Sequence, residues 1–435
     1  MRRHRRPAAH VEELVVERLA IGGAGVAKRA DGSAVFVPGT APGERVQADV
    51  DARTRPARGR LLRVLEPSRD RVAAACPFVD ACGGCDWMHL SLEAQRAGHA
   101  ELVRAAIAHA TSIADLPAVR VHPAPAPLAY RARARLHAAV HRGRVRVGFR
   151  GAASHELAEI DTCAVLDPEL DRVLVELPAL LAGASGSGEI VLARGGSARP
   201  IVEIHWRGEL AASTWAAIDA RVPSAWDGAR VLLEGASLPA SFGDPRPRMV
   251  GADGFALVIA PGGFAQTSEA GASLLARRVA DLALGDAPAA GRHVLELFAG
   301  SGTLSILLAA GAASFAAVEL DPEAARSARE NLAARGLDGK VTAANADAFA
   351  IPPRAEVTVL DPPRAGAAGA ASAIAASRVR RVVYVACDAA TLARDLGVMT
   401  RAGLRITEIE TFELFPQTSH VEVVVRLGRD ATLAS

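Results

Sequence analysis

Five cysteines are the side chains in this 435-residue chain whose types and spacing point most directly to chemistry. Cys76, Cys82 and Cys85 form a C-x5-C-x2-C run, and the two glycines inside it allow the backbone to fold tightly around an inorganic centre. Three thiolate ligands need a fourth, and Cys163 is the natural candidate. Cys387 follows a predicted strand late in the chain and suggests a nucleophile. Such an odd, unevenly spaced set favours metal binding or catalysis in a reducing compartment over a disulfide scaffold.

The spacing of the first three cysteines bears on which metal they hold. Zinc and iron–sulfur clusters both accept thiolate ligands, so ligand softness alone does not separate them. Structural zinc sites commonly use paired C-x2-C units, whereas this run has five residues and then two between its cysteines. The pattern favours an iron–sulfur cluster, with zinc as the alternative.

A glycine turn in the last third of the chain indicates a cofactor site. The predicted strand ending at Phe298 runs into Gly300 and Gly302, which permit close approach of the backbone to a ligand. The third glycine of a dinucleotide-binding G-x-G-x-x-G motif is absent. Glu319 ends the next strand, where it can accept hydrogen bonds from ribose hydroxyls, and Asn345-Ala-Asp347 ends another strand, at the usual place for a contact with an adenine edge. In this order the elements resemble the S-adenosylmethionine site of Rossmann-like methyltransferases.

The next two strands deliver the groups that would carry out the reaction. Asp361-Pro-Pro-Arg364 has an arginine where enzymes that methylate exocyclic amino groups have an aromatic residue, so amine methylation is disfavoured. Cys387 ends the following strand, at the ligand-binding edge. A methyltransferase needs a thiol when its target is carbon 5 of uracil, because a thiolate that adds to carbon 6 makes carbon 5 nucleophilic. A general base must then remove the carbon 5 proton, and Glu422 is the candidate.

The elements that position these residues predict a multidomain α/β protein. Residues 1–10 are a basic arm, and residues 11–67 alternate short strands with Gly and Pro turns, as in a small OB-like β-barrel. Residues 254–435 alternate apolar strands with amphipathic helices, which predicts a doubly wound, mainly parallel Rossmann-like sheet. Residues 68–253 form a central α+β domain that carries the cysteine run. Its helical segment, about 91–116, can pack on the catalytic domain.

Basic residues suggest that the partner is a polyanion. Residues 1–70 contain 14 Lys or Arg and 9 Asp or Glu, and residues 120–150 contain eight arginines and no acidic residue. Six of the eight occur with period two, which places each triplet on one face of a strand in a predicted hairpin. We therefore expect RNA contacts from Arg131, Arg133, Arg135, Arg142, Arg144 and Arg146.

Two classes of protein are disfavoured by the sequence. No uninterrupted apolar stretch is long enough to span a membrane, and the arginine-rich start is not followed by the apolar segment of a signal peptide. A cytoplasmic protein with no membrane contact is expected. No motif indicates a protein partner.

Taken together, these motifs resemble the RNA uracil-C5 methyltransferase family that has an N-terminal TRAM barrel and an iron–sulfur domain. The resemblance covers nearly the whole chain and includes Phe415-Pro-Gln-Thr-Ser-His-Val-Glu422. It implies a [4Fe-4S] cluster on Cys76, Cys82, Cys85 and Cys163, with Cys387 as nucleophile and Glu422 as base. It also implies S-adenosylmethionine contacts from Gln266, Phe298, Thr303, Glu319, Asp347 and Asp361, beside the turn formed by Gly300 and Gly302.

The chain departs from the family pattern next to the nucleophile. Family members commonly read Ser-Cys-Asn-Pro, whereas this chain reads Ala386-Cys387-Asp388-Ala389. The implied activity is methylation of carbon 5 of a uridine in structured RNA, with 23S rRNA ranked above tRNA because barrel and cluster together resemble the ribosomal branch. The alternatives are a tRNA uridine-C5 methyltransferase and a non-catalytic RNA-binding iron–sulfur protein.

Overall fold

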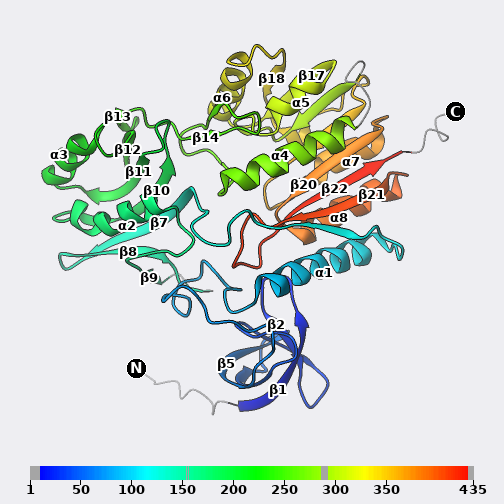
Figure 1. Cartoon of the computed structure of the whole chain (residues 1–435), viewed down its shortest axis with the longest axis horizontal. Coiled ribbons are helices and arrows are strands. Elements are labelled where there is room, and N and C mark those ends of the chain that lie inside the picture. Colours follow the sequence, from blue (N-terminus) through cyan, green and yellow to red (C-terminus); the bar gives the residue numbers. More distant parts are fainter. Residues whose placement is uncertain (1–9, 153, 155, 286–291, 430–435) are drawn as a thin grey trace.

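The structure is a computed structural model, and it describes residues 10–152, 154, 156–285 and 292–429. Residues 1–9, most of the predicted basic arm, lie outside the described residues. The described chain is built around three main sheets: a small barrel, a central sheet and a larger sheet covered by helices (Figure 1). No described helix is both long enough and apolar enough to cross a membrane.

The N-terminal segment closes into the small β-barrel that the sequence predicts. Its strands run in the order β1-β2-β3-β5-β4 and comprise β1 (His10–Leu19), β2 (Gly25–Lys28), β3 (Ala34–Val37), β4 (Arg45–Asp51) and β5 (Ala57–Glu66). Alternate residues of β4, including Val46 and Ala48, point inward against Val16 and Val35. The prediction misses β2, because four residues after a double glycine carry too little alternation to reveal a strand.

The central part contains a 7-stranded sheet of order β13-β12-β11-β10-β7-β8-β9. Helices α2 (Pro168–Leu180) and α3 (Ala212–Arg221) contribute buried residues to its core. Leu174 and Leu177 of α2 pack with Leu136 and Ile190 of the sheet in one buried cluster. The strands are β7 (Arg133–His141), β8 (Arg144–Arg150), β9 (Leu157–Glu159), β10 (Ser185–Arg194), β11 (Pro200–Glu209), β12 (Gly228–Leu233) and β13 (Ala240–Gly243), and a separate ribbon joins β14 (Arg248–Val250) to β15 (Ala256–Val258).

The C-terminal part is the predicted doubly wound sheet, with 8 strands in the order β18-β17-β16-β19-β20-β22-β21-β6. The parallel strands β16 to β20 are followed by an antiparallel β21–β22 hairpin. The strands are β16 (His293–Leu297), β17 (Ser314–Glu319), β18 (Lys340–Ala343), β19 (Val357–Leu360), β20 (Arg381–Ala386), β21 (Arg405–Phe412) and β22 (Glu422–Gly428). The helices are α4 (Glu269–Leu284), α5 (Ser305–Gly311), α6 (Pro322–Ala333), α7 (Ala368–Ala376) and α8 (Ala389–Arg401), with a 3-10 turn η1 (Ala346–Ala348).

Residues far earlier in the chain complete this sheet. Strand β6 (Val119–His122) pairs in parallel with β21 at the sheet edge, and helix α1 (Leu92–Thr111) buries Val103 and Ile107 in the same core as α7 and α8. The sequence predicts the helix but treats the proline-rich segment around β6 as a connector. A four-residue strand between prolines is tolerated because it lies at an edge.

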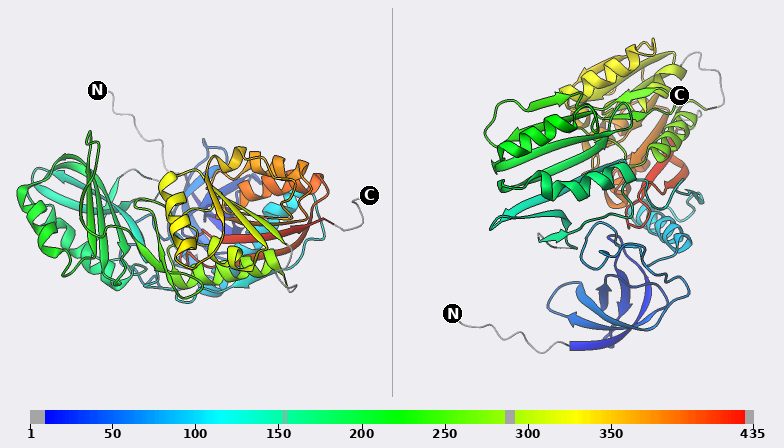
Figure 2. Two further views of the ribbon diagram at one scale, coloured as in Figure 1. Left: turned by 90° about the horizontal axis from the view of Figure 1, so that it is seen from above. Right: turned by 60° about the vertical axis from the view of Figure 1, so that its left-hand side comes forward.

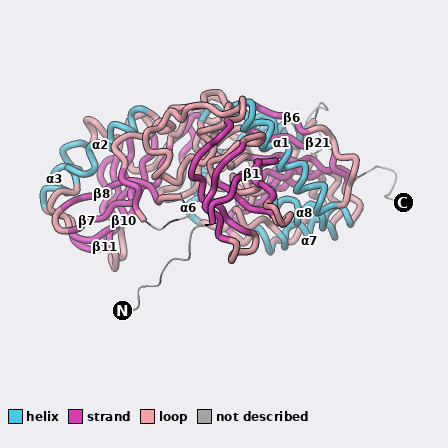
Figure 3. Tube along the Cα trace, turned by 90° about the horizontal axis from the view of Figure 1, so that it is seen from below, coloured by secondary structure: helices cyan, strands magenta, loops and turns pink. Residues whose placement is uncertain are grey.

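The barrel lies below the junction of the two larger sheets. Viewed from below, β1 lies between the central strands on one side and α1 with α8 on the other (Figure 3). The turned views show the same arrangement, with the barrel next to α1 (Figure 2). Leu19 and Ala41 of the barrel pack in one buried cluster with Trp87 and Leu90, so the segment before α1 joins the barrel to the helix.

A buried carboxylate joins three elements of the catalytic sheet and predicts a stability effect. Glu410 is 1% exposed, and its oxygens lie 2.7 Å from Arg278 Nη2 of α4 and 2.7 Å from His122 Nε2 of β6. We expect Arg278→Leu to lower the free energy of unfolding by about 3 kcal/mol, because it leaves a buried charge without its main partner. The measurement is chemical or thermal unfolding.

The exposed pair between Arg326 and Glu323 provides the control for this prediction. Arg326→Leu should leave the unfolding midpoint almost unchanged, because exposed ion pairs contribute little. Equal shifts for Arg278→Leu and Arg326→Leu would contradict the role assigned to the buried carboxylate.

Candidate active site

Three functional side chains meet at the carboxyl edge of the catalytic sheet. Cys387 follows β20, Asp361 follows β19, and Glu422 begins β22. Leu360 pairs with Tyr384 across β19 and β20, and Ala386 pairs with Val423 across β20 and β22. The ends of β19 and β20 and the start of β22 therefore lie at the same edge of the sheet. The pairing brings together residues that lie 26 and 35 positions from Cys387 in the sequence.

Electrostatics at this edge hold the thiol in its neutral form. Burial, followed by the charges of Glu422 and Asp361, raises the pKa of Cys387 to about 11, while Arg364 acts in the opposite direction. Glu422 is 2% exposed, and burial together with the Asp361 charge raises its pKa well above the usual range. Burial also raises the pKa of Asp361. The pocket therefore combines an unionised thiol with a carboxylate of enhanced basicity, which suits a general base.

Arg364 supplies the positive charge that acts on Cys387 and Glu422. It lowers the pKa values of Cys387 and Glu422. Its Nη2 atom lies 3.4 Å from His420 Nε2, and burial followed by the Arg364 charge lowers the pKa of His420. The neutral form of His420 is therefore favoured. Nothing in the sequence shows the contact between Arg364 and His420.

The glycine turn after β16 has the backbone that a ligand-binding loop requires. Gly300 has a φ of +56°, and a side chain there would meet only open space within 4 Å, whereas Gly302, with a φ of +94°, lies against Ala328 of α6. Phe298 also has a positive φ of +63°. Thus Gly302 serves helix packing, and Gly300 leaves room for a bound molecule. Thr303 follows the turn directly and precedes α5.

Glu319 is already oriented by the loops around it. Its Oε2 accepts a hydrogen bond from Gly300 N at 2.8 Å, and its Oε1 accepts one from Asp321 N at 2.8 Å. Asp347 has a structural contact as well, because its Oδ1 accepts a hydrogen bond from Ala370 N at 2.9 Å near the start of α7. Glu319 ends β17 as expected, whereas Asp347 lies in η1 beyond the end of β18, and each also fixes local backbone.

Two further buried side chains, Gln266 and Glu296, are relevant to cofactor binding. Gln266 is 7% exposed, and its Oε1 atom has no hydrogen-bond partner in the structure, so it offers an unused acceptor. Glu296 lies inside β16 and accepts a hydrogen bond from Ser305 Oγ at 2.5 Å, and burial raises its pKa to about 8. The sequence does not single out Glu296, because a carboxylate within an apolar strand has no motif. The open space at Gly300 and the unused Gln266 acceptor fit a small polar cofactor.

The four early cysteines line one mostly apolar cavity of about 60 Å³. Phe78, Met88 and Arg131 also line it. Burial and the proximity of the other cysteines raise the pKa values of Cys82 and Cys85, the latter to about 12, while Arg131 lowers both. Among the described residues, no three His, Cys, Asp or Glu side chains form a group that could hold a metal ion. The structure thus brings Cys76, Cys82, Cys85 and Cys163 to one cavity without presenting a formed single-ion site.

The predicted arginine surface is only partly assembled. Strands β7 and β8 form the expected hairpin around Arg142 and Gly143, but neighbouring strands supply the acidic residues that the segment lacks. Arg135 Nη1 lies 2.6 Å from Glu189, and both Arg144 and Arg146 bond to Glu159. The inference of uncompensated charge is wrong for these three, because β9 and β10 come from later sequence.

Arg131 and Arg133 have other surroundings. Arg131 precedes β7 and lines the cysteine cavity, so it does not share a sheet surface with the others. The Nε atom of Arg131 and the Nη1 atom of Arg133 are buried without hydrogen-bond partners. Burial lowers the pKa of Arg133.

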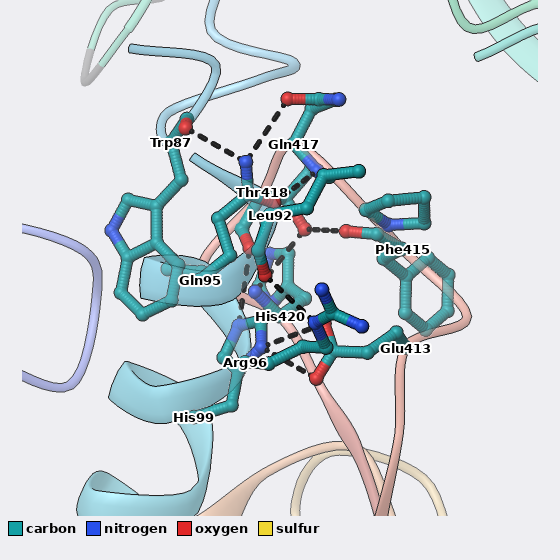
Figure 4. A network of polar contacts seen from close by, with 12 residues as sticks. Trp87, Leu92, Gln95, Arg96, His99, Glu413, Phe415, Gln417, Thr418 and His420 are labelled. Carbon is teal, nitrogen blue, oxygen red and sulfur yellow. Dashed lines mark hydrogen bonds and ion pairs between the residues drawn. The ribbon is translucent and has the colours of Figure 1, made fainter. Parts of the chain in front are cut away.

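The loop between β21 and β22 leads directly into Glu422 and is held by earlier parts of the chain (Figure 4). Gln95 of α1 accepts a hydrogen bond from Gln417 N at 2.8 Å. His99 lies with Nδ1 3.0 Å from Glu413 and with Nε2 3.1 Å from Thr418 O. The sequence predicts a shaped turn here, but it does not predict that α1 holds it.

Comparisons with known sequences identify the same parts of the chain. The family described as tRNA (Uracil-5-)-methyltransferase matches residues 354–430, the TRAM domain matches residues 10–62, and the family described as Conserved hypothetical protein 95 matches residues 283–390. The first match contains Asp361, Cys387 and Glu422. The TRAM match coincides with the barrel.

Full-length relatives extend this similarity over the whole chain. The 23S rRNA (uracil(1939)-C(5))-methyltransferase RlmD of Halomonas elongata is 35% identical, over 98% of this chain and 93% of that protein. The protein of the same name from Chromohalobacter salexigens is 34% identical, over 98% of this chain and 91% of that protein.

A solved structure shows the same fold. Pyrococcus abyssi tRNA (uracil-54, C5)-methyltransferase, in complex with S-adenosyl-L-homocysteine, aligns with a TM-score of 0.74 and 22% identity over 96% of this chain and 100% of that one. With the catalytic edge, the barrel and the full-length relatives in agreement, the chain belongs to the RNA uracil-C5 methyltransferase family.

Proposed function

We propose that this protein transfers a methyl group from S-adenosylmethionine to carbon 5 of a uridine in 23S rRNA. The observation that carries the proposal is the convergence of Cys387, Asp361 and Glu422 at one sheet edge, next to an open glycine turn. Relatives that match nearly the whole chain are named for this reaction on 23S rRNA. The same substrate implies the cytoplasmic location expected from the sequence.

S-adenosylmethionine supplies an electrophilic methyl group on a sulfonium cation. The residues proposed to hold this cofactor are the open turn and the polar groups around it, namely Gln266, Phe298, Gly300, Gly302, Thr303, Glu319, Asp347 and Asp361. The unused Oε1 acceptor of Gln266 and the side-chain space at Gly300 support this assignment.

The roles of the protein's own groups follow from their positions. Sγ of Cys387, as the thiolate, adds to carbon 6 of the uracil, and the electron pair of the ring double bond makes carbon 5 nucleophilic. After carbon 5 has gained the methyl group, Glu422 removes its proton. The C5–C6 double bond then re-forms, the S–C6 bond breaks, and sulfur leaves with its electron pair as thiolate. The raised pKa of Glu422 makes it a stronger base than an exposed carboxylate.

The barrel and the central sheet are the proposed RNA-binding parts. Arg133 is a weaker candidate for an RNA contact, because its Nη1 atom is buried and out of reach of a phosphate. Arg135, Arg142, Arg144 and Arg146 remain proposed contacts, and RNA binding would compete with the ion pairs of Arg135, Arg144 and Arg146. Arg131 is a weaker candidate for RNA binding because it lines the cysteine cavity.

A tRNA substrate is the second candidate, because the matching family description and the aligned structure both name tRNA enzymes. Deletion of the gene and mass-spectrometric mapping of total RNA separate the two. The account predicts that one 5-methyluridine disappears from 23S rRNA, whereas loss from tRNA alone would favour the alternative.

We also propose that Cys76, Cys82, Cys85 and Cys163 hold a [4Fe-4S] cluster. All four line one cavity with an apolar wall, and Arg131 supplies a positive charge that offsets the negative charge of four thiolates. A cubane cluster spreads its ligands more widely than a tetrahedral zinc ion, in which each sulfur lies about 2.3 Å from the metal.

The catalytic assignment is tested by replacing the nucleophile. We expect Cys387→Ala to lower methyl transfer by about 10⁴-fold or more, because no other group can activate carbon 5. Transcript containing 5-fluorouridine should give a denaturant-resistant conjugate with the unaltered protein and none with the variant. Glu422→Gln is the matched control: it should still form the conjugate on ordinary RNA but release it about 10²–10⁴-fold more slowly. Undiminished transfer by Cys387→Ala would contradict the assignment.

The cluster is tested by metal content and colour. Protein purified without oxygen should be brown, should contain about four iron and four sulfide per chain, and should bleach on oxidation. Cys85→Ala should lose the visible absorbance, whereas Cys387→Ala should retain it. Colourless protein with one zinc per chain would contradict the iron–sulfur proposal.

A further inference from the structure

The tip of the barrel touches the loop that leads into Glu422. Gly23, in the turn between β1 and β2, is buried and has a φ of +87°. A Cβ atom at this position would lie 2.2 Å from Asp86 Oδ2 and 3.0 Å from the Cβ of Ser419. The barrel backbone therefore packs directly against a residue that lies three positions before Glu422 in the sequence.

Asp86 and Trp87 connect the same two segments by hydrogen bonds. Asp86 Oδ1 accepts a hydrogen bond from Ser419 N at 2.7 Å. The backbone N–H of Trp87 donates to Gln417 O at 3.0 Å, while its indole Nε1–H donates to Gly23 O at 2.9 Å. Trp87 is fully buried, so it bridges the barrel tip and the loop within one packed contact.

Helix α1 also holds the loop (Figure 4). Gln95 exchanges two hydrogen bonds with Gln417, at 2.8 Å and 3.1 Å. The ring of His99 stacks on Trp87 with centroids 4.5 Å apart and lies between Glu413 and Thr418. Phe412 pairs with Glu422 where the loop closes, so a shift of the loop would displace the carboxylate of Glu422, which directly follows it.

We propose that the barrel tip at Gly23 positions the loop of residues 413–421, and through it the carboxylate of Glu422, for removal of the carbon 5 proton. The contact at Gly23 then acts as a positioning element for the catalytic edge. This inference rests on the proposed function, because it takes proton removal as the task of Glu422. Gly23, Asp86 and Trp87 are positioning residues in this scheme.

The reaction step that slows distinguishes a positioning role of the barrel tip from a role in RNA binding alone. A displaced loop leaves thiol addition and methyl transfer available, because Cys387 lies between β20 and α8 rather than on the loop. Slower proton removal delays cleavage of the S–C6 bond, so the methylated protein–RNA adduct accumulates. Weaker RNA anchoring would instead raise the KM for RNA without accumulation of that adduct.

Neighbouring glycines provide a matched pair of variants. Gly22 and Gly23 both have a φ of +87°, so alanine introduces a similar backbone strain at each, but a side chain at Gly22 meets nothing within 4 Å. Gly23→Ala should lower kcat by at least about tenfold, leave the KM for RNA unchanged, and accumulate a denaturant-resistant conjugate that carries the labelled methyl group. Gly22→Ala should behave like the unaltered protein in all three measurements.

Equal kcat values for the two glycine variants, or a Gly23→Ala effect confined to the KM for RNA, would overturn the proposal. If Gly23→Ala does not fold, Trp87→Phe decides, because it removes the hydrogen bond to Gly23 O and retains an aromatic ring. Trp87→Phe should accumulate the methylated conjugate, whereas Trp215→Phe in the central domain should not. Failure of the proposed function would show separately, as methyl transfer retained by Cys387→Ala.

Discussion

A half-buried thiol under the influence of two nearby carboxylates governs the chemistry of this site. Burial disfavours the thiolate of Cys387, and the nearby charges of Glu422 and Asp361 disfavour it further. Arg364 is the main opposing charge. The neutral thiol is a poor nucleophile and is less open to oxidation, since the thiolate is the reactive form in both reactions. The Cys387 thiol is therefore unreactive in the free protein, and positive charge that enters the pocket favours formation of the thiolate.

The carboxylate of Glu422, which opposes formation of the Cys387 thiolate, is suited to the later removal of the carbon 5 proton. Glu422 lies in a buried position where its pKa is raised, so it accepts a proton more readily than an exposed glutamate. Adding a thiol to uracil and removing a proton from the adduct make opposite demands on local charge. The sheet meets both demands by placing the two groups on adjacent strands and Arg364 beside them.

Positioning of this edge depends on contacts between distant parts of the chain. The loop before Glu422 is bonded to Trp87, Gln95 and His99, more than 300 residues earlier. Strand β6 extends the sheet, and Glu410 links it to α4 through Arg278. Domains that look consecutive in the sequence are thus interleaved in space.

Much of the catalytic sheet could be predicted because its strands are apolar runs that end in chemically distinctive residues. Strands β19 and β20 end directly before Asp361 and Cys387, as expected, and the N-terminal segment forms the expected barrel. The charge balance of the arginine hairpin could not be predicted, since Glu159 and Glu189 reach it only through strand pairing. Likewise, no local pattern could show that Gly23 and His99 meet the loop before Glu422, or that Arg131 lines the cysteine cavity. The roles of Cys387, Glu422 and the four cavity cysteines remain predictions.

Site-resolved alkylation of Cys387 is the most direct test of the electrostatic account. The protein without RNA or cofactor is treated with a small alkylating agent across a range of pH, and the Cys387 peptide is quantified by mass spectrometry. The account predicts a midpoint near pH 11, and a lower midpoint in the Glu422→Gln variant because one opposing charge is gone. A midpoint at or below the value of free cysteine, about 8.5, would contradict it.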